Sequence, residues 1–119
     1  HNVNDKITKA NSFSTNLYFK FDASILEIEQ KNKLDTFINK INNLSNYTIY
    51  IYGHTDRKGS RDYNLKLSYK RAENVKSYLL LNNITNKIII EGYGEVQTLI
   101  NTKDGVKEKQ NRRTEVILK

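Results

Sequence analysis

Hydrophobic and polar residues alternate with two different periods along this chain. In some stretches apolar residues alternate with polar ones or form short β-branched and aromatic runs, which predicts strands. The predicted strands are residues 16–22, 47–53, 87–94 and 113–119. Residues 47–53 (YTIYIYG) carry the most aromatic and β-branched side chains, so we expect this strand to lie at the centre of a sheet.

In other stretches apolar residues recur every three or four positions, which predicts amphipathic helices over residues 27–44 and 61–81. Ser60 or Asp62 is available to cap the second helix. Residues 82–86 (NNITN) predict a turn.

The order strand, helix, strand, helix, strand, long connection, strand predicts an α/β fold: a two-layer βαβαββ sandwich whose mixed sheet of about four strands carries both main helices on one face. We expect the first crossover to be parallel and right-handed, while the direction of the last strand stays open. Residues 1–15 are polar and aperiodic, which predicts a flexible linker or tag remnant before one domain over residues 16–119. Residues 94–110 predict a long polar loop.

Composition narrows the functional classes without choosing among them. The chain has 119 residues, a net charge of +7 and a pI near 9.5, which favours an anionic partner such as nucleic acid, an acidic membrane surface or a cell-wall polymer. The lysines are scattered, as on a solvated surface. Without cysteine there is no disulfide or thiolate metal site, and we expect no cofactor. His1 in place of a start methionine indicates an excised fragment, so an export signal or membrane anchor would precede it.

The second predicted helix has polar residues on the face that should be buried. Asn64, Ser68 and Arg71 share this face with apolar residues. A buried guanidinium needs a carboxylate, a carbonyl group, water or a ligand as partner. Asp56, in the loop before the helix, is the nearest candidate. Two interpretations stay open: a salt bridge that pins the loop to the helix, or a site that recognises two charges at once.

The stretch from residue 53 to 75 resembles the signature of the OmpA-like C-terminal peptidoglycan-binding domains, which is GHTD, a short glycine-containing loop and N-x-x-L-S-x-x-R-A-x-x-V. The matching residues are Gly53, His54, Thr55, Asp56, Gly59, Asn64, Leu67, Ser68, Arg71, Ala72 and Val75. Residues 18–24, 92–95 and 111–116 resemble other parts of the family. Thr98 departs from it, because proline is common there, and this predicts a looser loop.

The resemblance implies a non-catalytic module that anchors an outer-membrane or envelope protein to the cell wall, in the periplasm. Its ligand would be the diamino acid of the peptidoglycan stem peptide, typically meso-diaminopimelate. Arg71 would clamp the carboxylate of this zwitterion and Asp56 would accept from its ammonium. The other implied site residues are Thr55, Asn64, Leu67, Ser68, Asp22, Ala23, Ser24, Arg57 and Lys58. For Asn64 and Ser68, local hydrogen bonding to the backbone is an alternative.

Three further residues, His54, Arg112 and Arg113, are candidates for a functional role. His54 lacks a second histidine at metal-ligand spacing, so we expect no metal and a His54 that orients its loop by hydrogen bonding. Arg112 and Arg113 would support the site or contact the glycan, or would be edge-strand charges that discourage aggregation.

Other functions remain as alternatives. The periplasmic domain of a flagellar stator protein resembles the same pattern and would be distinguished by the sequence upstream of residue 1. A basic nucleic-acid-binding domain would explain the charge, although the tyrosines do not form the spaced platform that stacks bases. A hydrolase using Ser60 or Ser68 with His54 would need a nucleophile-elbow sequence, which the chain lacks.

Overall fold

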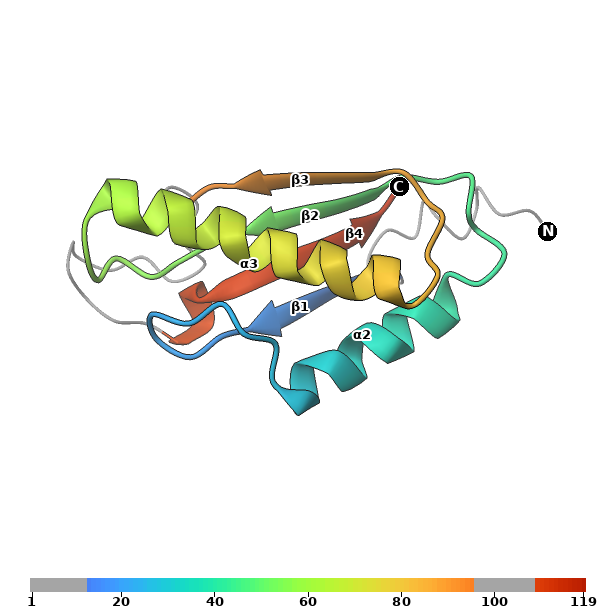
Figure 1. Ribbon diagram of the computed structural model, residues 1–119, viewed down its shortest axis with the longest axis horizontal. Coiled ribbons are helices and arrows are strands. Elements are labelled where there is room, and N and C mark those ends of the chain that lie inside the picture. Colours follow the sequence, from blue (N-terminus) through green and yellow to red (C-terminus); the bar gives the residue numbers. More distant parts are fainter. Residues whose placement is uncertain (1–12, 96–108) are drawn as a thin grey trace.

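The computed structural model describes residues 13–95 and 109–119 and has two layers, a sheet and a pair of helices (Figure 1). Its elements are β1 (Ser14–Tyr18), α2 (Ile28–Lys40), β2 (Ile49–Gly53), α3 (Arg61–Leu81), β3 (Ile88–Gly92), the 3₁₀ helix η2 (Lys109–Asn111) and β4 (Arg113–Leu118). Both α-helices cover the same face of the sheet. In the described part of the chain, no helix is long and apolar enough to cross a membrane.

The sheet is mixed, with strand order β1-β4-β2-β3. β2 and β3 are parallel, whereas β4 lies antiparallel to both β1 and β2. β1 and β2 therefore point the same way, as the predicted parallel crossover requires. The direction of the last strand, which the sequence left open, is antiparallel. The predicted α/β class and the single helical layer are confirmed.

The first strand is shifted relative to the prediction of residues 16–22. It begins at Ser14, two residues earlier, and ends at Tyr18, and Phe13 before it is buried. The chain then turns, with the N–H of Ala23 bonded to the Lys20 carbonyl and Asp22 at a φ of 59°. The aromatic alternation of residues 19–21 therefore belongs to a connection. Residues 1–12 and 96–108, and with them most of the predicted linker and Thr98, lie outside the described residues.

The helix boundaries follow local chemistry. α2 ends at Lys40 rather than at residue 44, because a turn follows in which Asn43 adopts a φ of 72°. Ile41 and Leu44 still reach the core from that turn. α3 spans the predicted range, and its cap is Ser60 rather than Asp62, since Ser60 Oγ accepts from the Tyr63 N–H at 3.2 Å.

The core lies between the two layers. It is built from Leu17, Ile49, Ile51 and Val116 of the sheet, Leu34 and Phe37 of α2, and Ala72, Val75 and Leu79 of α3, among others. Two glycines allow α3 to pack closely against the sheet, because there is no room for a side chain at either position. A Cβ on Gly53 would lie 1.8 Å from the Ser68 carbonyl oxygen, and one on Gly92 would lie 2.7 Å from Ser68 Oγ. This close approach sets the loop after β2 beside the first turns of α3.

Candidate functional site

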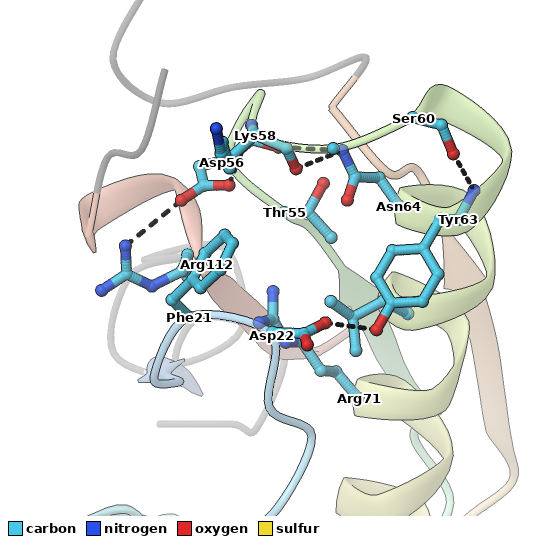
Figure 2. Close-up of a pocket in the computed structure, with 12 residues that line it drawn as sticks. Phe21, Asp22, Thr55, Asp56, Lys58, Ser60, Tyr63, Asn64, Arg71 and Arg112 are labelled. Carbon is cyan, nitrogen blue, oxygen red and sulfur yellow. Dashed lines mark hydrogen bonds and ion pairs between the residues drawn. The ribbon is translucent and has the colours of Figure 1, made fainter. Parts of the chain in front are cut away.

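A cavity of about 530 Å³ lies between the connection after β1, the loop after β2 and the first turns of α3 (Figure 2). Its walls are formed by Phe21, Asp22, Thr55, Asp56, Lys58, Gly59, Ser60, Tyr63, Asn64, Leu67, Arg71 and Arg112. Asp56 and Arg71 therefore border one shared cavity. Of the other residues predicted for the site, Asp22, Thr55, Lys58, Asn64 and Leu67 also line it.

The contacts that hold Asp56 at the cavity wall include one with Lys58 and one with Arg112. Its Oδ1 accepts from the backbone N–H of Lys58 at 3.2 Å, and its Oδ2 forms an ion pair with Nη1 of Arg112 at 3.2 Å. The Asp56 side chain is only 3% exposed and that of Arg112 14%. The loop therefore presents a carboxylate in a fixed position with little access to bulk water.

Arg71 is a buried cation that is held by backbone carbonyl groups. Its Nε donates to the Ala23 carbonyl at 2.7 Å, Nη1 to that of His54 at 2.8 Å and Nη2 to that of Lys20 at 3.2 Å. The guanidinium also lies 5.0 Å from the centre of the Phe19 ring. Burial lowers the pKa of Arg71 to about 10, and the negative charge of Asp56 opposes that shift. Arg71 is therefore still charged at neutral pH.

The salt bridge between Asp56 and Arg71, one of the two interpretations of the sequence, is not formed, although both residues lie in the described part of the chain. Asp56 pairs with Arg112, and none of the ion pairs between described residues includes Arg71. A guanidinium has five N–H groups, and the three carbonyl bonds use three of them. Among the described residues, no carboxylate contacts the positive charge of Arg71, which lies at the edge of the cavity.

Asn64 and Ser68 bond to their local surroundings. The amide of Asn64 donates to the Lys58 carbonyl at 3.1 Å and to Oε1 of Glu95 at 3.2 Å, so it ties the Asp56 loop to α3 while bordering the cavity. Ser68 donates to the Leu65 carbonyl and accepts from the Gly94 N–H, both at 2.8 Å, and does not line the cavity. Local bonding, the alternative that the sequence allowed, describes the contacts of Ser68.

The connection after β1 forms the opposite wall through Asp22, whose carboxylate accepts from the Tyr63 hydroxyl. Ala23 and Ser24 are not part of the wall. The Ala23 carbonyl holds Arg71, and the Ser24 carbonyl accepts from Asn74 at 2.6 Å. Across the cavity, Thr55 is 1% exposed, and its hydroxyl has no hydrogen-bond partner among the described residues. Arg57 does not line the cavity.

Five wall residues were not among those predicted for the site: Phe21, Gly59, Ser60, Tyr63 and Arg112. Arg112 carried a signal, because it belongs to the stretch 111–116 that resembles the family, but it was also compatible with edge-strand charge. That alternative is wrong, since β4 lies between β1 and β2 and Arg112 reaches Asp56. Apart from their aromatic character, nothing in the sequence indicated that Phe21 and Tyr63 belong to the site.

His54 lies in the loop after β2, and its ring does not line the cavity. The ring is buried, stacks on Tyr93 with 5.6 Å between ring centres and approaches Glu115, with Nε2 3.6 Å from Oε1. The backbone of His54 donates to the Arg113 carbonyl and accepts from Arg71. His54 therefore connects β4 to Arg71 through its main chain.

Glu115 gives a pH-dependent contribution to stability. The nearby ring of His54 and the hydrogen bonds from Arg113 lower the pKa of Glu115 from 4.5 to about 2. A carboxyl group whose pKa is depressed by folding stabilises the protein above its unfolded pKa, and this contribution is lost as the pH falls from about 4.5 to about 2. Glu115→Gln should therefore lower the free energy of unfolding at pH 7 by about 1–2 kcal/mol, after allowance for solvent screening.

Urea denaturation between pH 7 and pH 2 measures this effect. The difference between Glu115→Gln and wild type should shrink steadily below about pH 4.5, because the wild-type carboxyl group then becomes protonated. Glu73→Gln, an exposed substitution of the same kind on α3, is the matched control. A difference that stays constant with pH would contradict the assignment to the charge of Glu115.

The chain is similar to known proteins of one family. Residues 18–112 match the model of the OmpA family. The chain is 35% identical over 105 residues to outer membrane protein A of Bordetella avium, covering 87% of the chain and 54% of that protein. It is 32% identical over 103 residues to the peptidoglycan-associated lipoprotein of Pseudomonas aeruginosa, covering 86% of the chain and 61% of that protein. The chain thus spans only about half to three fifths of these relatives.

Solved structures share the fold. The crystal structure of the peptidoglycan-associated lipoprotein from Burkholderia pseudomallei superposes with a TM-score of 0.79 at 27% identity, covering 87% of this chain and 89% of that one. The C-terminal domain of Helicobacter pylori MotB gives a TM-score of 0.74 at 17% identity, covering 88% and 84%, which shows a common fold alone.

Proposed function

The chain belongs to the OmpA family, and on that premise we propose that it binds peptidoglycan through the free end of the diamino acid in the stem peptide. One observation carries the proposal. A buried carboxylate, Asp56, and a buried guanidinium, Arg71, border the same cavity without contacting each other in an ion pair. A ligand that carries an anion and a cation on one carbon would meet both.

The ligand carboxylate would bind at Arg71. The carbonyl groups hold the guanidinium in place but cannot neutralise it, so an incoming carboxylate gains a fixed and partly dehydrated cation. The hydroxyl of Thr55, which has no partner among the described residues, is available to donate in the same cavity.

The ligand ammonium would bind at Asp56. A carboxylate offers about four acceptor directions, and Lys58 and Arg112 are among the groups that Asp56 already contacts. The ammonium would therefore share Asp56 with Arg112 or displace it. Diaminopimelate, whose side-chain end has one ammonium and one carboxylate on the same carbon, fits this pair of charges better than lysine does, because lysine lacks the carboxylate.

At the level of the cell, the proposed role is to attach an outer-membrane or envelope protein to the wall from the periplasm. This role is supported by the name of the Pseudomonas relative, a peptidoglycan-associated lipoprotein. A flagellar stator domain is the alternative, but the likeness to MotB is one of fold.

Titration with a soluble stem peptide tests the proposal. NMR shifts should localise to the cavity residues, and a peptide with lysine in place of diaminopimelate should bind at least about 10-fold more weakly, because Arg71 loses its partner. Binding to a short DNA duplex, with affinity that falls steeply with salt and no response to the peptide, would instead support the nucleic-acid alternative. Equal affinity for both peptides would contradict recognition of the zwitterion.

A further inference from the structure

A second hollow lies beside the cavity that Asp56 and Arg71 border. It has a volume of about 220 Å³ and is here called the lysine hollow, and its lining residues are Asp22, Ser24, Tyr63, Lys66, Leu67 and Lys70. Three of these residues, Asp22, Tyr63 and Leu67, also line the cavity. The hydrogen bond from the Tyr63 hydroxyl to the Asp22 carboxylate, drawn in Figure 2, therefore lies at the boundary between the two. A ligand in the cavity can extend across this boundary.

The order of side chains around α3 explains why the two sites adjoin. At 100° per residue, Leu67, Tyr63, Lys70 and Lys66 follow Arg71 in the same sense, at about 40°, 80°, 100° and 140°. The beginning of this series lines the cavity, and its end lines the lysine hollow. Leu67 and Tyr63, in the middle, border both.

The lysine hollow carries a net positive charge. Lys66 and Lys70 are exposed and lie one turn apart on α3, and across residues 13–95 and 109–119 neither takes part in an ion pair. Asp62 and Glu73 are at helical spacing from these lysines but form no ion pair with them. The lining residues thus include two ammonium groups and one carboxylate, that of Asp22, which accepts from Tyr63. Such a wall attracts an anion.

We propose that Lys66 and Lys70 form a second subsite for the stem peptide, which binds a carboxylate next to the diamino acid. This inference rests on the proposed function, because the peptide must first place its zwitterionic end between Asp56 and Arg71. That end has no net charge, so it makes no use of the positive charge of the chain. The rest of a stem peptide is anionic. Its carboxylates are the α-carboxylate of the γ-linked glutamate before the diamino acid and the terminal carboxylate of the alanine after it.

The length of the ligand suits this placement. Arcs of about 100° and 140° from Arg71 to the two lysines correspond to about 9–14 Å along the surface of a helix about 5–6 Å in radius. In the peptide, three methylene groups and about one residue of chain separate the zwitterionic carbon from either carboxylate, which is about 9–13 Å when extended. The flexible stems of the lysines add further reach. Leu67 and Tyr63 would contact the aliphatic part of the ligand between its two charged ends.

Isothermal titration calorimetry tests the proposal with the soluble tetrapeptide L-alanine, γ-linked D-glutamate, meso-diaminopimelate and D-alanine. Its amino terminus is acetylated, because an amide replaces the ammonium there in the wall. In about 20 mM salt, Lys66→Gln combined with Lys70→Gln should weaken binding about 5- to 10-fold, since each exposed ammonium makes a modest contribution. The difference should shrink in about 0.3 M salt, because salt screens exposed charges.

Two modified peptides identify the carboxylate that is bound. One carries isoglutamine, in which a carboxamide replaces the α-carboxylate, and the other ends in an amide. Amidation of the bound carboxylate should weaken binding to wild type about 5- to 10-fold and cause no further loss in the double glutamine variant, because the interaction is then already absent. The peptide that shows this pattern names the source. If neither peptide binds wild type more weakly, or if each binds wild type and the variant with equal losses, the subsite is overturned.

Lys40→Gln combined with Lys87→Gln is the matched control. Both lysines are exposed, and Lys40 ends α2 while Lys87 precedes β3, at the end of the sheet away from the loop after β2. This variant loses the same two charges and should bind the tetrapeptide within about 2-fold of wild type, because the lost charges lie more than a Debye length from the ligand at moderate salt. Circular dichroism should show that every variant is folded.

The outcomes separate this inference from the proposed function. If the Lys66 and Lys70 variant binds the tetrapeptide as the control does, while Asp56→Asn still weakens binding, the lysine subsite is overturned and the proposed function stands. If wild type does not bind the tetrapeptide in the cavity at all, the proposed function fails and the subsite fails with it. A loss confined to the Lys66 and Lys70 variant, and absent with one amidated peptide, supports both.

Discussion

Arg71→Ala should lower the free energy of unfolding by about 3–5 kcal/mol. The side chain is fully buried and is the hydrogen-bond donor for the carbonyl groups of Lys20, Ala23 and His54. Truncation would leave these acceptors facing a void, and each unsatisfied buried acceptor costs about 1–3 kcal/mol when water does not replace the lost donor. The connection after β1 and the loop after β2 would lose the group that joins them.

Urea denaturation of wild type, Arg71→Ala and Lys70→Ala measures this effect. Lys70 is the exposed neighbour of Arg71 on α3, so Lys70→Ala should change the free energy of unfolding by less than about 0.5 kcal/mol. Arg71→Lys should fall between Arg71→Ala and wild type, because an ammonium keeps the charge but cannot span three carbonyl groups with a planar fork. An Arg71→Ala protein as stable as wild type would show that water replaces the guanidinium.

This result would change how loss of binding in Arg71 variants is interpreted. If Arg71 served only to bind the ligand, its removal would abolish binding and leave the fold intact. The structure gives Arg71 two roles, since the same guanidinium that borders the cavity also supports its walls. Arg71→Ala therefore tests stability more directly than ligand binding. Ligand binding is better tested by substituting a residue that makes fewer contacts with the rest of the fold.

Features set by residues close together in the sequence could be predicted, whereas contacts between residues far apart in the sequence could not. The elements and the single helical layer follow from periodicity within a few residues, and the Ser60 cap bonds only three residues away. The Asp56 to Arg112 ion pair joins positions 56 residues apart and exists because β4 inserts between β1 and β2, an order that periodicity does not encode. The carbonyl partners of Arg71 likewise depend on the turn after β1, whose boundaries the aromatic alternation hid.

The residues of the candidate site divide in the same way. Asp56 and Arg71 could be identified from the sequence because charged side chains are rarely fully buried unless they are paired. The choice between a salt bridge and two separate charges, however, required knowledge of which other groups come near, and Arg112 is that group. Phe21 and Tyr63 enter the wall only because the connection after β1 folds back onto α3, as Figure 2 shows.

Asp56→Asn should weaken binding of a diaminopimelate-containing stem peptide by about 30- to 150-fold, the equivalent of about 2–3 kcal/mol. Asparagine has nearly the same shape and keeps an acceptor for the Lys58 N–H, but it cannot neutralise a ligand ammonium. Arg112, which is 14% exposed, can turn to water when its partner is lost. The free energy of unfolding should therefore fall by no more than about 1 kcal/mol.

Isothermal titration calorimetry on folded Asp56→Asn and Asp62→Asn measures the difference. Asp62 is exposed in the first turn of α3 and does not line the cavity, so Asp62→Asn makes the same change in net charge without touching the site. It should bind as wild type does. If the two variants bind the peptide equally well, then neither the position of Asp56 nor its charge contributes to recognition, and an ammonium ligand at this cavity is excluded. If instead only Asp56→Asn is impaired, the loss comes from a single carboxylate whose location, at 3.2 Å from Arg112 and on the same cavity as Arg71, makes a zwitterion the simplest ligand.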